Sequence, residues 1–545
     1  MKNILIAIRS IFKKGRHNVM KIVSLGIGLA VGLVLIAKVY FEQSYDDFYP
    51  DRDRVYQVWA KYQQNGGELK DYPQTSGGIA PTMQQQIPEI ETVTRYTSFG
   101  DWTFTMTDTK MKYSGRCIIA DSCFFDILPR PMLIGNAKEV LSTPMYVLIS
   151  SRIAKNIGGD VIGKNFTVDS SPGRTMTIGG VFEEVPENSH SRYDVIVSMA
   201  SAGRFMWEGS PTNMLGNDRY ISYVKLHKGV NPLALEEQVH TFVNSYFPPE
   251  EQQKTGFNIG FSFHELDGLH KELPQVKRMT WILSLLAFAL IFTAVMNYIL
   301  IVISSIVNRS KEVAVHKCYG ASENNIHGMM FGEALVHIVL SLILALLLIL
   351  AFRGTVEELL ATSLDSLLLS NGSLVLLGIC ILVFFVSGFM PGSLYARIPV
   401  ASAFRNYREN KRIWKKALLL VQFVATGFLV TMLVFVARQY TFMVNDRPGY
   451  AYENLAYCGL AGVDSTSRAK ILDEVMRLPG VVAATTVYQL PFEHASGNNI
   501  LLPGETQELF NIADLYWVGN GYLDMMEIPV IQGRSFTENV TNSRE

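Results

Sequence analysis

The chain has 545 residues, of which 48% are apolar, and a formal net charge of −1. At about 150 residues per domain, this length allows several domains. The near-zero charge argues against a nucleic-acid partner, which requires a basic surface, and the apolar content is high for a soluble protein.

Five segments are apolar over enough residues to cross a bilayer as a helix, which takes about 20 residues. They are residues 20–40, 279–307, 334–352, 367–387 and 417–437. In the first, Lys21 and Lys38 lie near the two ends, where we expect their ammonium groups to reach the polar interface. A signal peptide is the alternative, but the apolar run is long for one and no clear cleavage site precedes the stretch 40–50. We therefore predict an uncleaved span.

The basic residues predict the orientation, because lysine and arginine gather on the cytoplasmic side of a membrane. They concentrate in residues 1–19, in the loop 308–322 and in the stretch 397–416. In the loop between the third and fourth spans, Arg353 is the only basic residue, and it lies beside the acidic residues Glu357, Glu358 and Asp365. We predict that the N-terminus is cytoplasmic and that residues 41–278 and 438–545 are exported.

The exported regions show the patterns of mixed α/β domains. Alternation of apolar and polar residues predicts strands at 54–60, 103–107 and 220–226, with a further candidate at 175–181. Helical spacing covers 80–86 and 233–246, and turn residues at 65–67 and 158–160 separate the elements. The predicted fold class is an α-helical multi-pass membrane protein with mixed α/β extracytoplasmic domains.

Two parts of the exported regions repeat each other. Residues 120–135 and 518–533 carry an aspartate, a proline and a glycine in the same register. The pairs are Asp126 with Asp524, Pro131 with Pro529 and Gly135 with Gly533. Weaker matches surround Pro88 and Pro479 and the motifs at 37–40 and 437–440. The repeat predicts a duplicated unit of one span, one exported domain and three further spans, with a truncated second copy.

The loop NRSKEVAVHKCYGAS, residues 308–322, resembles the cytoplasmic loop of MacB/FtsX-like ABC transporter permeases. The matching positions are Arg309, Lys311, Glu312, Lys317, Gly320 and Ala321. The segments VFEEVPENSHSRYDVIVSM (181–199) and SSRIAKNIGGDVIGKNF (150–166) resemble the MacB-like periplasmic core domain. PGSLYARIPVASAFR (391–405) resembles the end of the FtsX-like permease domain. Cys318 and Tyr319 depart from the pattern, since aliphatic residues are commoner there.

The resemblance implies a layout for the whole chain. It comprises a cytoplasmic segment (1–19), a span (20–40), a MacB-like periplasmic core domain (41–278), an FtsX-like permease domain (279–416), a fifth span (417–437) and a second, incomplete periplasmic core domain (438–545). It also implies a bacterial inner membrane. The implied partners are a cytosolic ABC ATPase subunit, membrane lipid, and a periplasmic adaptor or outer-membrane component.

The basic loop has two readings. A helix that ends at Gly320, with Lys/Arg and Glu on its exposed face, can dock into a cytosolic partner, which the resemblance identifies as the ATPase. Alternatively, the charges are solvated and simply obey the rule that cytoplasmic loops are basic. The chain has no G-x-x-x-x-G-K-[ST] motif, so we do not expect it to hydrolyse ATP alone. We predict no catalytic residues, cofactor or metal.

Small and polar residues in the spans predict helix packing. Gly28 and Gly32 have the G-x-x-x-G spacing that lets helices approach closely. Asn297 and His337 are expected to bond to neighbouring helices rather than to ions.

Two other motifs carry weaker chemistry. In HELDGLH the histidines His264 and His270 are six residues apart, whereas a metalloprotease helix needs four, so no metal site is expected. Cys117 and Cys123 can form a disulfide only in an oxidising compartment, and their spacing fits no known framework.

The resemblance implies a permease subunit of the mechanotransmission type. Such a subunit would couple ATP hydrolysis by a separate subunit to periplasmic export or extraction of an antimicrobial, a peptide or a lipoprotein. The predicted span interiors hold no Asp, Glu, Lys or Arg, which argues against an ion pathway. The alternative is a transmembrane scaffold that signals to a periplasmic partner without transport, and a membrane-anchored hydrolase is a weaker third.

Overall fold

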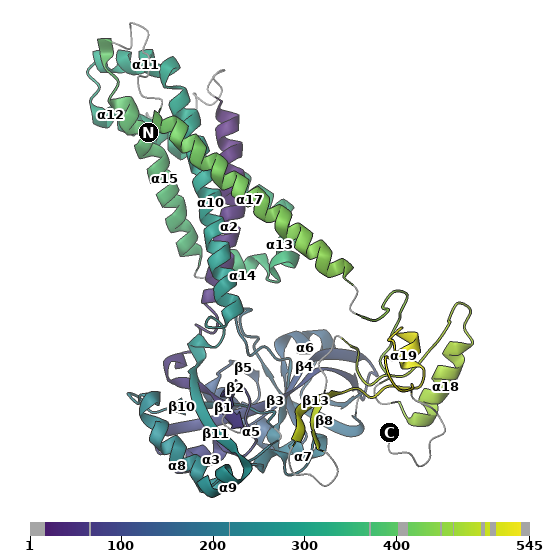
Figure 1. Ribbon diagram of the computed structural model, residues 1–545. Helices are drawn as coiled ribbons and strands as arrows, with labels where there is room; N and C mark the ends of the chain where they lie inside the picture. The colour runs from purple at the N-terminus through teal and green to yellow at the C-terminus, as the bar shows by residue number, and fades with distance from the viewer. Residues whose placement is uncertain are drawn as a thin grey trace. The chain divides into compact units, whose positions relative to one another are not determined.

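The computed structural model describes residues 17–64, 67–169, 171–216, 218–369, 372–401, 413–446, 449–460, 463–491, 496–501 and 508–535 (Figure 1). The chain divides into two compact units, one up to residue 427 without 169–172, and one from residue 428 onward with 169–172. Three sequence features lie outside the described residues: the basic tail 1–16, the turn at Asn65-Gly66, and the basic stretch 402–412.

Among the described residues, five helices are long and apolar enough to cross a membrane. They are α2 (Asn18–Gln43), α10 (Pro274–Ser304), α12 (Glu323–Ala351), α15 (Ser373–Ala396) and α17 (Ile413–Asn445). Each overlaps one predicted span, so the prediction of five membrane helices is confirmed at the level of length and composition.

The fourth span differs most from its prediction. It was expected at 367–387, but α15 begins at Ser373 with Gly372 at its N-cap. The leucines before it belong to a separate short helix, α14 (Leu364–Leu368), which is capped by Ser363: the hydroxyl accepts a hydrogen bond from Ser366 N at 3.2 Å. The prediction from hydropathy merged α14 and α15 into one span because both helices are rich in leucine. A further short helix, α13 (Arg353–Leu360), precedes α14.

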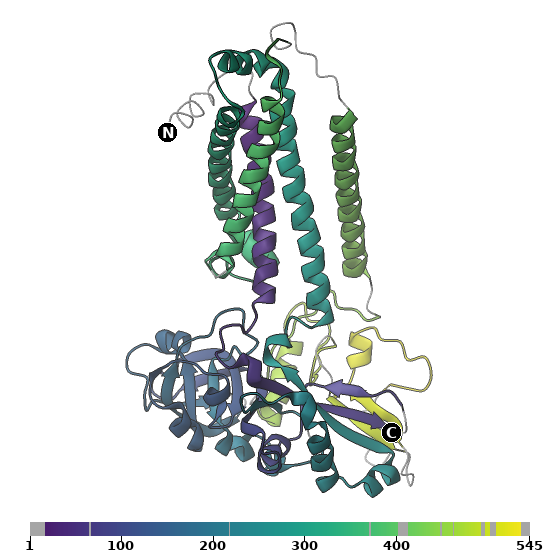
Figure 2. The same cartoon turned by 90° about the vertical axis from the view of Figure 1, so that its left-hand side faces the viewer.

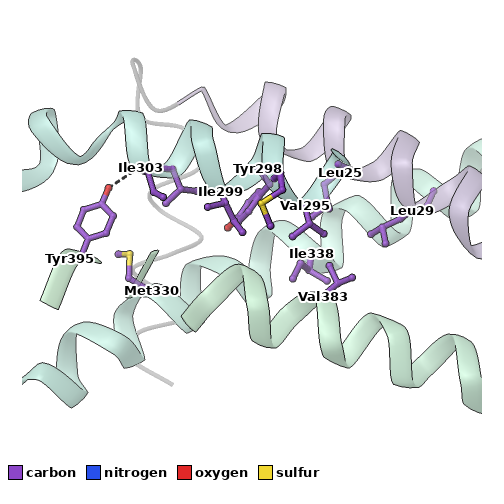
Figure 3. Close-up of a cluster of buried hydrophobic side chains, with 14 of the residues drawn as sticks. Leu25, Leu29, Val295, Tyr298, Ile299, Ile303, Met330, Ile338, Val383 and Tyr395 are labelled. Atoms are coloured by element: carbon purple, nitrogen blue, oxygen red, sulfur yellow. Dashed lines mark hydrogen bonds between the residues drawn. The ribbon is translucent and has the colours of Figure 1, made fainter. Parts of the chain in front are cut away.

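Four of the long helices, α2, α10, α12 and α15, pack together and are called the bundle here. Side chains from all four meet in its core, among them Leu25, Ile299, Ile338 and Val383 (Figure 3). The helix α11 (Ile306–Cys318) follows α10 directly and ends before Gly320. Because the bundle buries apolar side chains from each helix, α2 is held as an integral member of it.

Gly28 and Gly32 lie where α2 meets α10. A Cβ added to Gly28 would lie 2.2 Å from the Cβ of Ala294, and one added to Gly32 would lie 2.4 Å from Cγ1 of Ile291. Real side chains do not fit at such distances, so the two glycines let the helices approach closely.

The residues between α2 and α10 form the sheet domain, which is built on one eleven-stranded sheet among the described residues. Its strands are β1 (Val55–Gln64), β2 (Lys70–Tyr72), β3 (Ile90–Met106), β4 (Lys112–Ala120), β5 (Met132–Ile134), β6 (Tyr146–Ser150), β7 (Asn165–Val168), β8 (Ser171–Phe182), β9 (Val195–Ser198), β10 (Ile221–Leu226) and β11 (Phe257–Glu265). The main order is β11-β1-β10-β3-β4-β9-β6-β8-β5; β2 pairs with β1, and β7 with β3 and β8. The pairs β4–β9 and β6–β8 are parallel.

Helices bury apolar side chains against this sheet. They are α3 (Ile79–Gln86), α4 (Phe124–Ile127), α5 (Ala137–Ser142), α6 (Ser151–Ile157), α7 (Ala202–Phe205) and α8 (Glu236–Tyr246). A further helix, α9 (Pro249–Thr255), has no buried residue. All four predicted strands lie in or overlap β1, β3, β8 and β10, and both predicted helices are present. The mixed α/β prediction is therefore confirmed for this domain.

The second unit contains α18 (Ser465–Met476), the antiparallel hairpin of β12 (Ser496–Leu501) and β13 (Glu508–Leu515), and α19 (Tyr522–Met525). The repeat pairs have similar local structure: Asp126 lies in α4 and Asp524 in α19, and Gly135 and Gly533 have φ of +85° and +94°. These likenesses agree with a duplication, but the duplication and the truncated second copy stay predictions.

Candidate functional site

The basic loop contains a helix with a well-formed end. Just beyond the end of α11, Gly320 has φ of +89°, its N–H donates to Lys317 O at 3.0 Å, and Ala321 N–H donates to His316 O at 3.0 Å. These two bonds make the Schellman motif, in which a residue in the left-handed region turns the chain out of the helix. Gly320 therefore stops α11 as its sequence position indicated.

Two of the charged residues on α11 face inward, contrary to the expected exposed face. Arg309 is buried; its Nη1 lies 2.8 Å from Glu333 Oε2 of α12, and its guanidinium lies 5.5 Å from the ring centre of Tyr395. Lys317 Nζ donates to Ala396 O at 2.6 Å and to Ile398 O at 2.8 Å. A lysine suits this place because the last carbonyls of a helix, here α15, carry partial negative charge. Arg309 and Lys317 thus fasten α11 to the bundle.

Glu333 also reaches α2. Its Oε1 lies 3.8 Å from Lys21 Nζ, and Lys21 is 1% exposed. The expectation that Lys21 extends to the interface was therefore wrong. Glu333 lies one residue before the predicted third span, so the interiors of the predicted spans still hold no charged residue, but α12 begins earlier and includes it. A charge can stay inside a bundle when another helix supplies its partner.

The outward face of α11 carries exposed and half-buried side chains that a partner could contact. Lys311 and His316 are exposed, and Glu312 is half-buried beside Arg309, with 3.7 Å between Oε2 and Nε. Val315 is 43% and Tyr319 89% exposed. An exposed aromatic next to a helix end is an effective anchor for a protein partner. Sequence reasoning treated Tyr319 only as a departure from the family pattern and missed it.

A second candidate site lies where the other end of α2 meets the sheet domain (Figure 2). Just beyond α2, Asp46 is fully buried and has φ of +60°. Its carboxylate accepts hydrogen bonds from Ser189 Oγ at 2.9 Å and His190 N at 3.3 Å, and lies 2.7 Å from His190 Nδ1. His190 Nε2 lies 2.6 Å from the hydroxyl of Tyr223, a core residue of β10. Asp46 and His190 thus join α2 to the centre of the sheet.

Ser189 and His190 belong to residues 186–190, called the junction segment here. This segment makes two more connections. Asn188 Nδ2 donates to Ser44 O at 2.6 Å, and Asp46 N donates back to Asn188 O at 2.8 Å. Glu187 Oε2 accepts from Ser363 N at 3.0 Å, at the cap of α14 between two bundle helices. The Pro-x-Asn-Ser-His motif is therefore the point where one short segment contacts α2, the sheet and the connection from α12 to α15.

Further polar contacts surround the end of α2. Lys38 Nζ lies 2.6 Å from Glu42 Oε1 and donates to Thr362 Oγ1 at 2.8 Å, so Lys38 is also buried and paired rather than extended to the interface. His270 Nε2 lies 2.6 Å from Glu42 Oε2, and its ring stacks on Tyr45. The histidines of HELDGLH are separated in the fold, since His264 lies in β11 and stacks on Trp59.

The remaining predicted polar residues differ in their surroundings. His337 is buried in α12, and its Nδ1 lies 3.2 Å from the hydroxyl of Tyr298 in α10, as expected for a contact between helices. Asn297 is exposed on α10. Contrary to the expectation, it therefore does not join two helices within the described part of the chain. Cys117 and Cys123 are both free thiols, and Cys117 is buried in β4.

Two family models match the chain. Residues 20–242 match the MacB-like periplasmic core domain, and residues 284–400 match the FtsX-like permease C-terminal domain. The chain belongs to the MacB/FtsX-like ABC transporter permeases. Members are the membrane component of ABC transporters, so the family implies a cytosolic ATPase as partner of this permease. Both sites described above lie within or beside the matched ranges.

Solved structures of single domains or regions also resemble part of this permease. A domain of a permease protein from Porphyromonas gingivalis is 33% identical over 40% of this chain and 91% of its own, with a TM-score of 0.37. The periplasmic region of MacB from Actinobacillus actinomycetemcomitans is 14% identical over 40% and 92%, with a TM-score of 0.28. The extracellular domain of the noncanonic ABC-type transporter YknZ from Gram-positive bacteria is 10% identical over 38% and 98%, with a TM-score of 0.27. No curated protein matches the chain.

Proposed function

We propose that this permease passes force from a cytosolic ATPase to its exported domain and so drives export or extraction of a substrate outside the membrane. The observation that carries the proposal is that α2 connects both candidate sites. At one end Lys21 pairs with Glu333, which holds Arg309 of α11; just beyond the other end Asp46 binds the junction segment. A movement of α11 thus has a continuous path to the sheet.

The outward face of α11 is the proposed docking surface for the ATPase. Lys311, Glu312 and His316 supply polar contacts, and Val315 and Tyr319 supply apolar area. Since Arg309 and Lys317 fasten α11 to α12 and α15, a push on α11 moves these helices rather than bending a loop. In this proposal α11 lies in the cytoplasm of a bacterial cell and the sheet domain lies outside its inner membrane.

At the outer end, the junction segment converts helix movement into a change of the sheet domain. It is bound to α2 through Ser44 and Asp46, and to the connection between α12 and α15 through Ser363. Any shift of α2 relative to α12 and α15 therefore strains residues 186–190, which continue into β9. The substrate would be an antimicrobial, a peptide or a lipoprotein, handed to a periplasmic adaptor or outer-membrane component.

The test uses the full chain reconstituted with its ATPase subunit, because the two sites should fail in different ways. Tyr319→Ala and Lys311→Glu should lower co-purification of the ATPase and stimulation of ATP hydrolysis. Lys311→Glu is a cleaner reversal than Glu312→Lys, which would also place a cation beside Arg309. Asn188→Ala should keep ATPase binding and hydrolysis but lose the ATP-dependent change in hydrogen exchange of residues 186–198.

Lys155→Ala, on the exposed face of α6, is the matched control and should behave as wild type in every assay. An ATP-dependent change of hydrogen exchange that is as large in Asn188→Ala as in wild type would contradict transmission through the junction segment. Normal ATPase binding by both Tyr319→Ala and Lys311→Glu would contradict docking on α11.

A further inference from the structure

The sheet domain contains a pocket of about 290 Å³ that is unusually rich in arginine. Four arginines line it: Arg116 of β4, Arg130 before β5, Arg152 of α6, and Arg192, two residues beyond the junction segment. Three carboxylates, Asp101, Glu184 and Asp194, line it as well. The pocket thus has one more positive than negative group, and the pairing of these groups decides where the excess charge lies.

Two of the arginines have acidic neighbours. Arg152 Nη2 lies 2.5 Å from Asp194 Oδ1, and its Nε lies 3.2 Å from Glu184 Oε1. Arg116 stands directly opposite Asp101 in the pairing of β3 with β4. Within the described residues, Arg152 is the only one of the four that forms an ion pair with a carboxylate. Positive charge without a direct counter-ion therefore lies on Arg130, which is buried, and on Arg116 and Arg192, which are exposed.

Arg130 is 6% exposed. Its Nη2 donates to Ser191 O and, at 2.9 Å, to Ser191 Oγ, but its buried Nε meets no acceptor among the described residues. Aromatic rings surround the guanidinium, with centres at 5.2 Å for Phe182 and 5.9 Å for Tyr193. Burial lowers the pKa of Arg130 from its ordinary value. A buried charge without a counter-ion is costly, and an anion in the pocket would remove that cost.

We propose that this pocket binds an oxyanion, a carboxylate or a phosphate group of a ligand in the exported compartment. Guanidinium groups suit this class because their planar N–H fork matches two oxygens of a carboxylate or phosphate. The volume lies near the lower end of small-molecule pockets, which begin at about 300 Å³. It therefore fits one anionic group with a small attached portion rather than a large apolar molecule.

The pocket shares its wall with the junction segment. His190 is bound to Asp46, and the next residues, Ser191 and Arg192, contact Arg130 or line the pocket. An anion held by Arg130 and Arg192 would thus lie beside the segment that joins the sheet domain to α2. The binding site itself does not depend on the proposed force transmission and is testable without the ATPase.

The experiment titrates the purified full chain, in lipid nanodiscs, with pyrophosphate and separately with citrate by isothermal titration calorimetry. Ionic strength is held constant with sodium chloride, so that screening is the same at each point. Wild type should show saturable binding of at least one probe. Arg130→Gln and Arg192→Gln should each weaken it at least fivefold, and Arg204→Gln, an exposed arginine of α7 outside the pocket, should leave it unchanged.

The two probes distinguish the sources of the anion. Arginine-dependent binding of pyrophosphate alone indicates a phosphate-bearing ligand, and binding of citrate alone a carboxylate-bearing one; both outcomes support the site. If Arg130→Gln fails to fold, the double variant Arg116→Gln/Arg192→Gln, at exposed rim positions, decides instead. Absence of saturable binding to wild type, or equal binding by the rim variants, would overturn the proposal.

Discussion

At the scale of single residues, the buried charges of the bundle depend on one another. Glu333 stands between Lys21 of α2 and Arg309 of α11, and all three side chains are buried. Removing one partner of a buried ion pair costs about 3–5 kcal/mol, because the other charge is left without compensation. The cost should therefore depend on which member of the three is removed.

We expect Glu333→Gln to be the more damaging change. It leaves two buried cations near each other and should cost about 3–5 kcal/mol. Arg309→Gln leaves Lys21 paired with Glu333 and should cost less, about 1–3 kcal/mol. Lys311→Gln, on the exposed face of α11, should stay within about 0.5 kcal/mol of wild type. Unfolding of the full chain in detergent measures all three, and an Arg309→Gln protein less stable than Glu333→Gln would contradict the arrangement.

At the scale of elements, two glycines act through different physics. Gly28 is needed for space, since an added Cβ would overlap Ala294 of α10. Gly320 is needed for its backbone, since nothing lies within 4 Å of an added Cβ but its φ is +89°. Each can be tested against a glycine that has neither constraint.

Gly28→Ala should destabilise the bundle by about 1–3 kcal/mol, as expected when a packed interface is overfilled. Gly378 of α15 is the matched control, because nothing lies within 4 Å of its added Cβ and its φ is ordinary. Gly378→Ala should be neutral or stabilising by up to about 1 kcal/mol, since alanine is the better helix former. Thermal unfolding of both variants checks this, and similar melting temperatures would show that α2 and α10 are not in close contact.

Gly320→Ala should cost about 1 kcal/mol through the left-handed backbone alone. If the end of α11 meets the ATPase, affinity for that subunit should fall about fivefold. The affinity of the Gly320→Asn variant should fall less, because asparagine tolerates positive φ better than alanine. Gly354→Ala, at an open position with ordinary φ, is the control. Equal affinity for the Ala variant and wild type would argue that this turn does not position the docking surface.

At the scale of the whole molecule, the orientation of the chain can be tested with its own cysteines. Cys318, at the end of α11, and Cys458, in the second unit, are both exposed. In versions that keep one of them and replace the other four cysteines by serine, a membrane-impermeant maleimide added from outside should label Cys458 but not Cys318. Labelling of Cys318 in intact cells would reverse the predicted topology. Disrupted cells supply the control, in which both should react.

Much of the architecture follows from the sequence because it depends on neighbours along the chain. Runs of about 20 apolar residues span a bilayer whatever lies beside them, alternation marks a strand such as β10, and Gly320 ends α11 through its own backbone. Asn297 and His337 show where such reasoning stops. Both are polar residues in membrane helices, yet only His337 faces a partner, because the rotation of each helix against its neighbours is set by packing.

The tertiary structure alone decided which charged groups meet. Arg309 and Lys317 look like the rest of a basic loop, but folding brings Arg309 to Glu333 and Lys317 to the end of α15. Asp46 and His190 are separated by 144 residues and form the link between membrane helix and sheet. No local pattern encodes such pairs, since the free energy that keeps a charge buried comes from a partner elsewhere in the chain. The sequence by itself thus determined the spans, the strands and the family, while the connection between the two sites arose only from long-range contacts.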